Sequence, residues 1–358
     1  MQQPTRIAVV GYGLIGRRHA AVVQRLPELD LCAIVEQSEE GRAIAREQGL
    51  AVYETIEAML DEAKPQGIVL ATPTPVHPEQ CLRTIAAGVP TLVEKPIAVT
   101  SRDALSITNA AEMAGVPLLV GHHRRHNGMV KAAKEAIASG AIGDVRAVQA
   151  TCWFYKPDYY FDVAPWRTKK GAGPISVNLV HDVDLLRHFC GEVESVQAVS
   201  APSRRGFENE DLATAILRFA SGAIATISVS DSIVGPWSWE MTARENPAYP
   251  ATQESCYLIG GSEGGLSLPD LRLWSHGKKP DWWTPINAQS LRCETEDPLV
   301  QQMLHFARVI SGEEPPLVTG LEGLKSLEVV EAVAESAATG REIAVQGGQA
   351  REPLAIPA

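Results

Sequence analysis

A glycine-rich segment near the N-terminus carries a pattern that is typical of nucleotide binding. It reads Gly11-Tyr12-Gly13-Leu14-Ile15-Gly16, follows an apolar run at residues 7–10 and leads into a segment with helical spacing. Glycines at these positions permit a tight turn and let backbone N–H groups approach a pyrophosphate at a helix N-terminus. All six residues are therefore expected to contact a dinucleotide. A tight turn that binds no nucleotide is the alternative, and the strand before and helix after the segment argue against it.

An acidic residue at the end of the next apolar run indicates which dinucleotide is bound. Glu36 follows Gly16 by twenty positions, where a carboxylate accepts hydrogen bonds from the ribose hydroxyls of adenosine. The same carboxylate would repel a 2′-phosphate, and Gln37 and Ser38 follow it instead of an arginine. The sequence therefore favours NAD as the cofactor. Arg42 is the nearest arginine and keeps NADP as the less favoured alternative.

Two polar segments follow later apolar runs. Thr72, Pro73 and His77 come after the run at residues 67–71, and Glu94 and Lys95 come after the run at 91–93. Loops at the carboxyl ends of parallel strands line the ligand crevice of such a sheet. These five residues are therefore expected to border the cofactor.

The elements that position these residues follow from hydrophobic periodicity. Short apolar runs at 7–10, 31–35, 67–71, 91–93 and 118–120 alternate with helical spacing, which predicts a doubly wound parallel sheet, a Rossmann α/β domain over residues 1–122 that binds NAD(P). Longer alternating strands follow at 145–155, 193–200, 212–219 and 223–230, with helices at 129–139, 176–189 and 320–338. They predict a second, α+β domain over residues 123–346, with a large, mostly antiparallel, open-faced sheet. Residues 347–358 are expected to form a tail.

A histidine on the predicted helix 176–189 offers acid–base chemistry. Asn178 and His181 are three residues apart, so they share one helix face and are expected to point into one cleft. An imidazole titrates near neutral pH, which suits His181 as a general acid or base. A structural, hydrogen-bonded histidine is the alternative.

Together, the glycine motif, Glu94-Lys95-Pro96 after its strand and the antiparallel second domain resemble the Gfo/Idh/MocA family of oxidoreductases, named for glucose–fructose oxidoreductase, inositol dehydrogenase and rhizopine catabolism. The resemblance covers nearly the whole chain, and the Glu-Lys-Pro motif is its specific mark. It implies an NAD(P)-dependent dehydrogenase that moves a hydride between nicotinamide and a hydroxyl-bearing carbon. The substrate class it implies is a sugar, an inositol-like polyol or a cyclic hydroxy acid.

The resemblance also implies roles for single residues. Lys95 would contact the reacting hydroxyl, where an ammonium stabilises a developing alkoxide. The family's second motif is a glycine-rich turn and helix with an aspartate and, four residues later, a histidine, and residues 171–184 match it. His181 is retained, but Val177 occupies the position of the aspartate. Asn178 is the nearby polar substitute and is expected to bind substrate.

Weaker signals complete the expected site. The segment at 121–127 and the pair Trp166-Arg167 resemble family segments at the domain junction and the cleft entrance. By that resemblance His123, Trp166 and Arg167 border the cofactor, while Arg124 and Arg167 bind substrate. Tyr155 would supply a ring for a sugar-like ligand, or it packs in an aromatic-rich strand end.

Composition excludes several other functions. The net charge of −11 argues against nucleic-acid binding. The six cysteines lack C-x-x-C spacing, and arginines interleave the histidines at 122, 123 and 126, so no metal site is expected. No signal-peptide pattern and no apolar run of membrane-spanning length is found, which predicts a cytoplasmic protein without membrane contact. Tryptophans in or beside predicted loops, such as Trp282 and Trp283, mark an interface or a ligand rim. The family resemblance implies that the second domain binds substrate and that the open face of its sheet forms a homodimer or homotetramer.

Two alternatives to a dehydrogenase remain open. One is an enzyme that cleaves glycosides through transient oxidation, as some members of the family do. The other is a non-catalytic, nucleotide-binding regulatory relative. Retention of Lys95 and His181 argues against the second, and Val177 in place of the aspartate argues for it.

Overall fold

The computed structural model describes residues 3–277 and 279–346. The chain divides into two compact units. Among the described residues, unit 1 contains residues up to 126 together with 296–327, and unit 2 contains residues between 127 and 295 together with 328–346.

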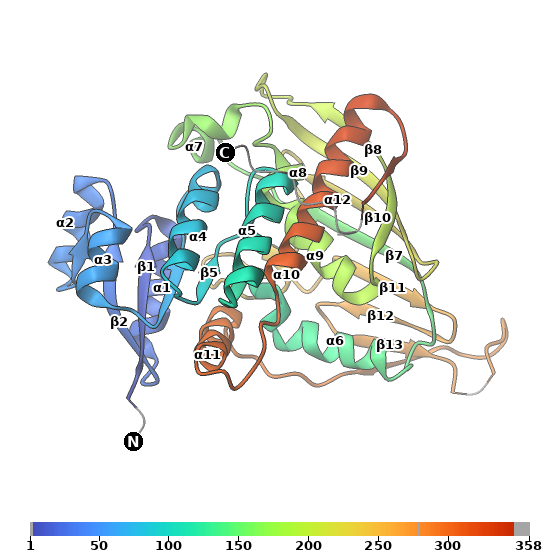
Figure 1. Ribbon diagram of the computed structural model, residues 1–358. Coiled ribbons are helices and arrows are strands. Elements are labelled where there is room, and N and C mark those ends of the chain that lie inside the picture. Colours follow the sequence, from blue (N-terminus) through green and yellow to red (C-terminus); the bar gives the residue numbers. More distant parts are fainter. Residues whose placement is uncertain (1–2, 278, 347–358) are drawn as a thin grey trace. The chain divides into compact units, whose positions relative to one another are not determined.

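Unit 1 is built on a six-stranded, fully parallel sheet in the order β3-β2-β1-β4-β5-β6 (Figure 1). Its strands are β1 (Thr5–Val10), β2 (Leu29–Val35), β3 (Val52–Tyr53), β4 (Gly67–Leu70), β5 (Thr91–Val93) and β6 (Leu118–Val120). Its helices are α1 (Leu14–Arg25), α2 (Glu39–Glu47), α3 (Ile56–Ala63), η1 (Thr74–Val76), α4 (His77–Ala86), α5 (Ser101–Ala114), η2 (His123–His126) and α11 (Pro298–Ile310). The five strands predicted in this region are confirmed, and the two-residue β3 is additional.

Alternation along β1 shows why this sheet is covered on both faces. Ile7 and Val9 join one apolar cluster with side chains of α1, α2 and α11, whereas Ala8 and Val10 join another with α3, α4 and α5. Successive side chains of a strand point to opposite faces, so a strand that is apolar throughout needs a helical layer on each side. The doubly wound Rossmann architecture predicted from the sequence is confirmed.

The domain bounds in the structure differ from those predicted from the sequence, because the chain returns into unit 1. A single boundary at residue 122 assigns 296–327 to the second domain, but Met303 and Phe306 of α11 are fully buried in the same cluster as Ile7 and Val9. Asp297 caps α11 by accepting a hydrogen bond from the backbone N–H of Leu299. A boundary drawn from local periodicity cannot detect a helix that packs on strands almost three hundred residues earlier.

Unit 2 contains a nine-stranded sheet in the order β14-β13-β12-β11-β7-β10-β9-β8-β15, antiparallel except where β7 pairs with β10. Its strands are β7 (Val145–Trp153), β8 (Val193–Pro202), β9 (Glu210–Phe219), β10 (Ile224–Ser230), β11 (Tyr257–Gly261), β12 (Gly264–Leu268), β13 (Arg272–Ser275), β14 (Asn287–Ser290) and β15 (Ile343–Ala344). Its helices are α6 (Gly128–Ala138), α7 (Asp158–Asp162), η3 (Pro165–Thr168), α8 (Pro174–Val177), α9 (Leu179–Cys190) and α10 (Trp239–Thr242). Helix α12 (Gly320–Thr339) gives its residues to both units, up to Leu327 to unit 1 and the rest to unit 2.

The helix expected at 176–189 is interrupted at its polar position. Helix α8 ends at Val177 and α9 begins at Leu179, with Asn178 between them at φ −104° and ψ −51°. Gly191 ends α9 with a φ of +92°, in the region that favours glycine. Helix α9 packs its apolar stripe against the sheet of unit 2, with Val183 and Leu186 completely buried.

None of the helices within residues 3–277 and 279–346 combines the length and apolar character that a membrane crossing requires.

Candidate active site

The three glycines of the turn after β1 have two different roles. Gly11 has a φ of +89°, and a Cβ atom there would lie 2.8 Å from the carbonyl oxygen of Ala71. A Cβ atom on Gly16 would lie only 1.9 Å from the carbonyl oxygen of Gly11, so these two glycines are required for the turn to close. A Cβ atom on Gly13 would meet no atom of the described chain within 4 Å. The turn therefore leaves an open approach to the first turn of α1, and a helix N-terminus of this kind is suited to binding a phosphate.

The Glu36 carboxylate at the end of β2 is fixed beside this turn. Its Oε2 accepts a hydrogen bond from the backbone N–H of Tyr12 at 2.7 Å, and its Oε1 accepts one from the backbone N–H of Ser38 at 2.8 Å. Partial burial acts to raise the pKa of Glu36, but these hydrogen bonds outweigh it and lower the pKa below the ordinary value. The group is thus an anion held in place, with lone pairs left for ribose hydroxyls.

Arg42, the arginine nearest in sequence to Glu36, is engaged by other groups. Its guanidinium lies 2.6 Å from the carboxylate of Glu39 and 3.3 Å from that of Glu54. It also donates to the carbonyl oxygen of Gln37 at 2.7 Å. A guanidinium neutralised by two carboxylates is a poor ligand for a 2′-phosphate, which supports the preference for NAD.

His77 joins the two loops that follow β4 and β5. The side chain is 1 % exposed, with Nε2 lying 2.8 Å from the carbonyl oxygen of Thr72 and Nδ1 lying 3.0 Å from that of Pro96. Burial lowers the pKa of His77 below that of an ordinary imidazole, and the two carbonyl contacts oppose this shift. Both ring nitrogens face the protein, so His77 fixes the neighbouring Thr72 and Pro73 relative to the Glu-Lys-Pro loop.

Glu94 anchors that loop to helix α1. Its Oε1 lies 2.7 Å from Nε2 of His19 in α1, and its Oε2 accepts a hydrogen bond from the backbone N–H of Lys95 at 3.1 Å. Burial acts to raise the pKa of Glu94, but the contact with His19 and the nearby charges of Lys95 and His123 lower it to about 2. A buried, ionised carboxylate therefore holds the backbone that carries Lys95, whose peptide bond to Pro96 is cis.

His19 is the residue of unit 1 that sequence reasoning missed. It is fully buried in α1, one turn beyond Gly16. A histidine within the otherwise apolar face of a short helix is the signal that could have pointed to a buried partner.

The last predicted site residues of unit 1 lie in the segment after β6. His123 and Arg124 lie in η2, where Arg124 is 3 % exposed, and the adjacent Arg125 forms an ion pair with Glu322 at 2.8 Å. Unit 1 therefore contains the glycine turn, Glu36, the two loops joined by His77, and η2.

Unit 2 contains the second set of predicted residues. Asn178 and His181 are both 8 % exposed, and the backbone N–H of His181 donates to the carbonyl oxygen of Asn178 at 3.1 Å. Oδ1 of Asn178 accepts a hydrogen bond from Nζ of Lys156 at 2.7 Å. Lys156, the residue after Tyr155, was not predicted as a site residue, and its burial at 5 % exposure marks it as a further functional candidate.

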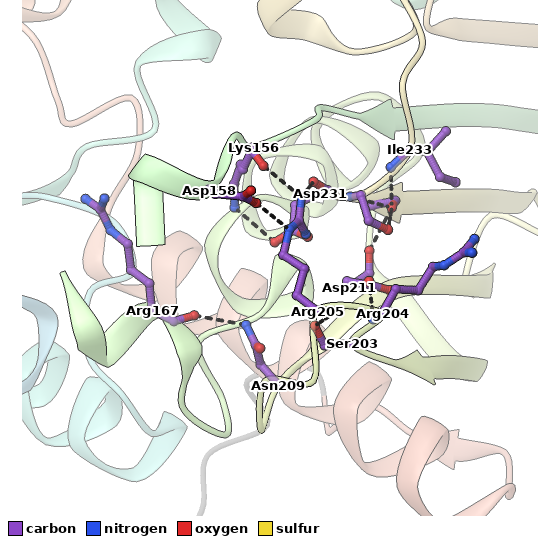
Figure 2. Close-up of polar contacts among 12 residues, drawn as sticks. Lys156, Asp158, Arg167, Ser203, Arg204, Arg205, Asn209, Asp211, Asp231 and Ile233 are labelled. Carbon is purple, nitrogen blue, oxygen red and sulfur yellow. Dashed lines mark hydrogen bonds and ion pairs between the residues drawn. The ribbon is translucent and has the colours of Figure 1, made fainter. Parts of the chain in front are cut away.

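The remaining predicted residues of unit 2 lie around α7 and η3. Arg167 donates from Nη1 to the carbonyl oxygen of Tyr160 at 2.7 Å, and its guanidinium lies 3.9 Å from the centre of that tyrosine ring. The carbonyl oxygen of Arg167 accepts a hydrogen bond from Asn209 (Figure 2). Tyr155 and Trp166 are 45 % and 58 % exposed, so their rings are available to a ligand.

Within the part of the chain that the structure describes, histidine, cysteine, aspartate and glutamate form no group of three or more that could hold a metal ion.

Comparison with known proteins now identifies the family. Residues 5–122 match the family model described as an oxidoreductase family with an NAD-binding Rossmann fold, and residues 130–267 match the model of the Gfo/Idh/MocA C-terminal domain. The chain belongs to the Gfo/Idh/MocA family of oxidoreductases. The resemblance inferred from the glycine motif and the Glu-Lys-Pro loop is thereby confirmed.

Several members of the Gfo/Idh/MocA family are similar to this chain over nearly its full length. A 1,5-anhydro-D-fructose reductase from Ensifer adhaerens is 28 % identical, covering 96 % of this chain and 99 % of the relative. A D-apiose dehydrogenase from Paraburkholderia graminis is 26 % identical, covering 97 % and 91 %. The crystal structure of the WlbA dehydrogenase from Bordetella pertussis, in complex with NADH and UDP-GlcNAcA, superposes with a TM-score of 0.76 at 27 % identity, covering 95 % and 98 %. The chain described here is thus an NAD(P)-dependent dehydrogenase that acts on CH–OH groups.

Proposed function

We propose that this dehydrogenase acts in the cytoplasm, with NAD as its preferred cofactor, on a sugar, an inositol-like polyol or a cyclic hydroxy acid. The observation that carries the proposal is the buried Glu94–His19 contact, which fixes the loop of Lys95 to the helix that follows the glycine turn. All six cysteines are free thiols, which suits a reducing compartment.

The residues of unit 1 fit a dinucleotide. The open approach at Gly13 leaves room for a pyrophosphate beside the N-terminus of α1, and the fixed Glu36 carboxylate suits the hydroxyls of a ribose. Thr72, Pro73, Glu94 and His123 would border the cofactor. When bound there, NAD supplies a hydride acceptor.

The remaining roles concern the substrate. Lys95 stabilises the negative charge that develops on the hydroxyl oxygen as its proton leaves, since an ammonium beside an alkoxide lowers the energy of that charge. We assign the removal of this proton to His181, whose imidazole is suited to general base catalysis. Asn178, Arg124, Arg167 and Tyr155 are assigned to binding the rest of the substrate.

NAD reduction across a panel of aldoses, inositols and quinate-like acids, followed at the nicotinamide absorbance, tests this function. We expect oxidation of at least one of these classes. With that substrate, the wild-type enzyme should prefer NAD over NADP by at least about tenfold in kcat/KM, or about 1.4 kcal/mol, because Glu36 lies where a 2′-phosphate would have to bind. Glu36→Ala should remove most of this preference.

Glu28→Ala provides the matched control, because Glu28 is an exposed carboxylate of the same unit just before β2. It should leave the cofactor preference unchanged. Equal use of the two cofactors by the wild-type enzyme would contradict the role of Glu36.

Val177 favours a second candidate function. It places an apolar side chain where the family motif has a carboxylate, which suits a relative that binds NAD but has lost turnover. NADH binding without oxidation of any compound in the panel would support this candidate over the dehydrogenase.

We also propose that the chain forms a homodimer or homotetramer through the outward face of the unit 2 sheet. Pairing of β9, β10, β7 and β11 places Ile216, Ile224 and Leu258 on one face, where they are 42 %, 43 % and 52 % exposed. Exposed aliphatic side chains on adjacent strands are typical of a protein interface. Light scattering should give a multiple of the 38.5 kDa chain mass, and Leu258→Glu should lower it. A wild-type monomer at micromolar concentration would refute the proposal.

A further inference from the structure

A buried lysine of unit 2 is directed at the polar break between α8 and α9. Nζ of Lys156 lies 2.7 Å from Oδ1 of Asn178, 3.8 Å from Oδ2 of Asp231 and 5.1 Å from the centre of the Tyr160 ring. Asp231 in turn lies 3.2 Å from a guanidinium nitrogen of Arg205, and Figure 2 shows Lys156, Asp231 and Arg205 gathered together. The side chain of Lys156 is therefore held on several sides.

The ammonium of Lys156 determines which way the amide of Asn178 points. An ammonium carries three N–H donors and no acceptor, so it can face only the amide oxygen. With Oδ1 turned toward Lys156, Nδ2 is the end left to interact with other groups. Among residues 3–277 and 279–346, none accepts a hydrogen bond from Nδ2 of Asn178.

The side chain of Asn178 does not act as a helix cap. Asn178 occupies the N-cap position of α9, where an asparagine side chain ordinarily accepts a hydrogen bond from the backbone of the first turn. Here Asn178 has αR backbone angles instead of extended ones, and its side chain accepts no hydrogen bond from the first turn of α9. Its Oδ1 accepts the hydrogen bond from Lys156.

Burial and nearby charges act in opposite directions on the amino group of Lys156. Burial lowers the pKa of Lys156, and Arg167 acts in the same direction. Asp231 and Glu240 oppose the shift, and Asp231 is the nearer partner. The carboxylate of Asp231 also remains paired with Arg205, so it is not left alone if Lys156 is replaced.

We propose that Lys156 is a positioning residue that fixes Asn178 as a hydrogen-bond donor, so that the site favours a substrate oxygen that is a stronger hydrogen-bond acceptor than a hydroxyl. A carboxylate or a carbonyl oxygen has this chemistry. The proposal rests on the proposed function, because it assumes that Asn178 faces the substrate. Val177 supports it, since the carboxylate it replaces would accept hydrogen bonds, whereas the fixed amide donates one.

Binding to the NADH-loaded enzyme tests this inference without turnover. D-Glucuronate and D-glucose share a ring and differ by a carboxylate against a hydroxymethyl group, and D-glucono-1,5-lactone provides the carbonyl counterpart of glucose. We expect calorimetry to show about tenfold tighter binding of one of the two acceptor-bearing compounds than of glucose, on the scale of one charge-assisted hydrogen bond. The compound that shows the preference identifies the carboxylate or the carbonyl as the recognised group.

Variants separate the positioning role from a structural one. Asn178→Asp exchanges the donating amide for an accepting carboxylate that still pairs with Lys156, so it should reverse the preference. Lys156→Met should reduce the preference several-fold because the amide is then free to turn over, and Lys156→Arg should retain part of it. Lys169→Met is the matched control, since Lys169 is a 62 %-exposed lysine of the same unit paired with Glu208.

The outcomes distinguish this inference from the proposed function. A preference that Asn178→Asp and Lys156→Met leave unchanged, in variants that melt cooperatively, would overturn the positioning role even if the enzyme oxidises the panel. Failure of both acceptor-bearing compounds to bind more tightly than glucose at millimolar concentration would also overturn it. A preference that reverses as expected, without oxidation of any panel compound, would sustain the inference and contradict the proposed function.

Discussion

Lys95→Met is expected to lower kcat by about 10²- to 10⁴-fold, the range for one group that stabilises charge or moves a proton in the transition state. NADH affinity should change by no more than a few-fold, because the glycine turn and Glu36 are separate from the Lys95 side chain. The fold should survive, since the loop is held by Glu94, whose carboxylate accepts from the backbone of residue 95 and not from its side chain. Steady-state kinetics and a fluorescence titration with NADH measure the two effects separately.

Lys64→Met is the control for this experiment, because Lys64 is an exposed lysine of the same unit at the end of α3. It should leave both measurements unchanged. If Lys95→Met retained more than about a tenth of the wild-type kcat, Lys95 would have no part in the chemistry and the proposed mechanism would fail.

Gly16→Ala and Gly13→Ala are expected to differ in kind, although both add one methyl group to the same turn. At Gly16 the new Cβ atom would lie 1.9 Å from a backbone oxygen, so the turn must move. We expect a loss of about 1–3 kcal/mol or more in the free energy of unfolding, as for other overpacked sites, together with loss of NADH binding. Thermal denaturation with and without NADH measures both quantities.

At Gly13 the methyl group would enter open space next to an extended backbone at φ −72° and ψ −164°, which alanine adopts without strain. The melting temperature without cofactor should therefore stay close to that of the wild type. NADH should bind at least about tenfold more weakly, because the methyl group would occupy the approach of the pyrophosphate. Wild-type affinity in Gly13→Ala would show that the phosphates do not pass over this residue.

The parts of the fold that could be predicted from the sequence are those with a strong local signal. The buried strands β1, β2, β4, β5 and β6 are continuous apolar runs, and β7 to β10 alternate clearly. Strands β11 to β14 were not predicted. Three of them show why: β12 begins with two glycines, β13 is short and only partly buried, and β14 is exposed along its whole length, so neither composition nor alternation separates them from loops. Their pairing with neighbouring strands, which a local pattern does not contain, makes them strands.

In the candidate site, too, local motifs could be predicted from the sequence, whereas contacts between distant residues could not. The glycine turn, Glu36 and the Glu-Lys-Pro loop are recognisable because their chemistry depends on residues that are adjacent in sequence. The contact between His19 and Glu94 joins residues 75 positions apart, and that between Lys156 and Asn178 joins residues 22 positions apart. No spacing in the sequence predicts either contact, because each contact depends on how separate elements pack. Whether the predicted side chains contact cofactor and substrate remains a prediction that the experiments above address.

The late return of α11 to the first sheet has a consequence for synthesis on the ribosome. When the first 126 residues have emerged, the face of the sheet that carries Ile7 and Val9 still lacks Met303 and Phe306, which are made nearly two hundred residues later. Part of the apolar surface of the nascent N-terminal segment therefore stays exposed while residues 127–295 are translated. At about 5–20 residues per second this exposure lasts on the order of ten seconds or longer, a period in which aggregation and chaperone binding compete with folding.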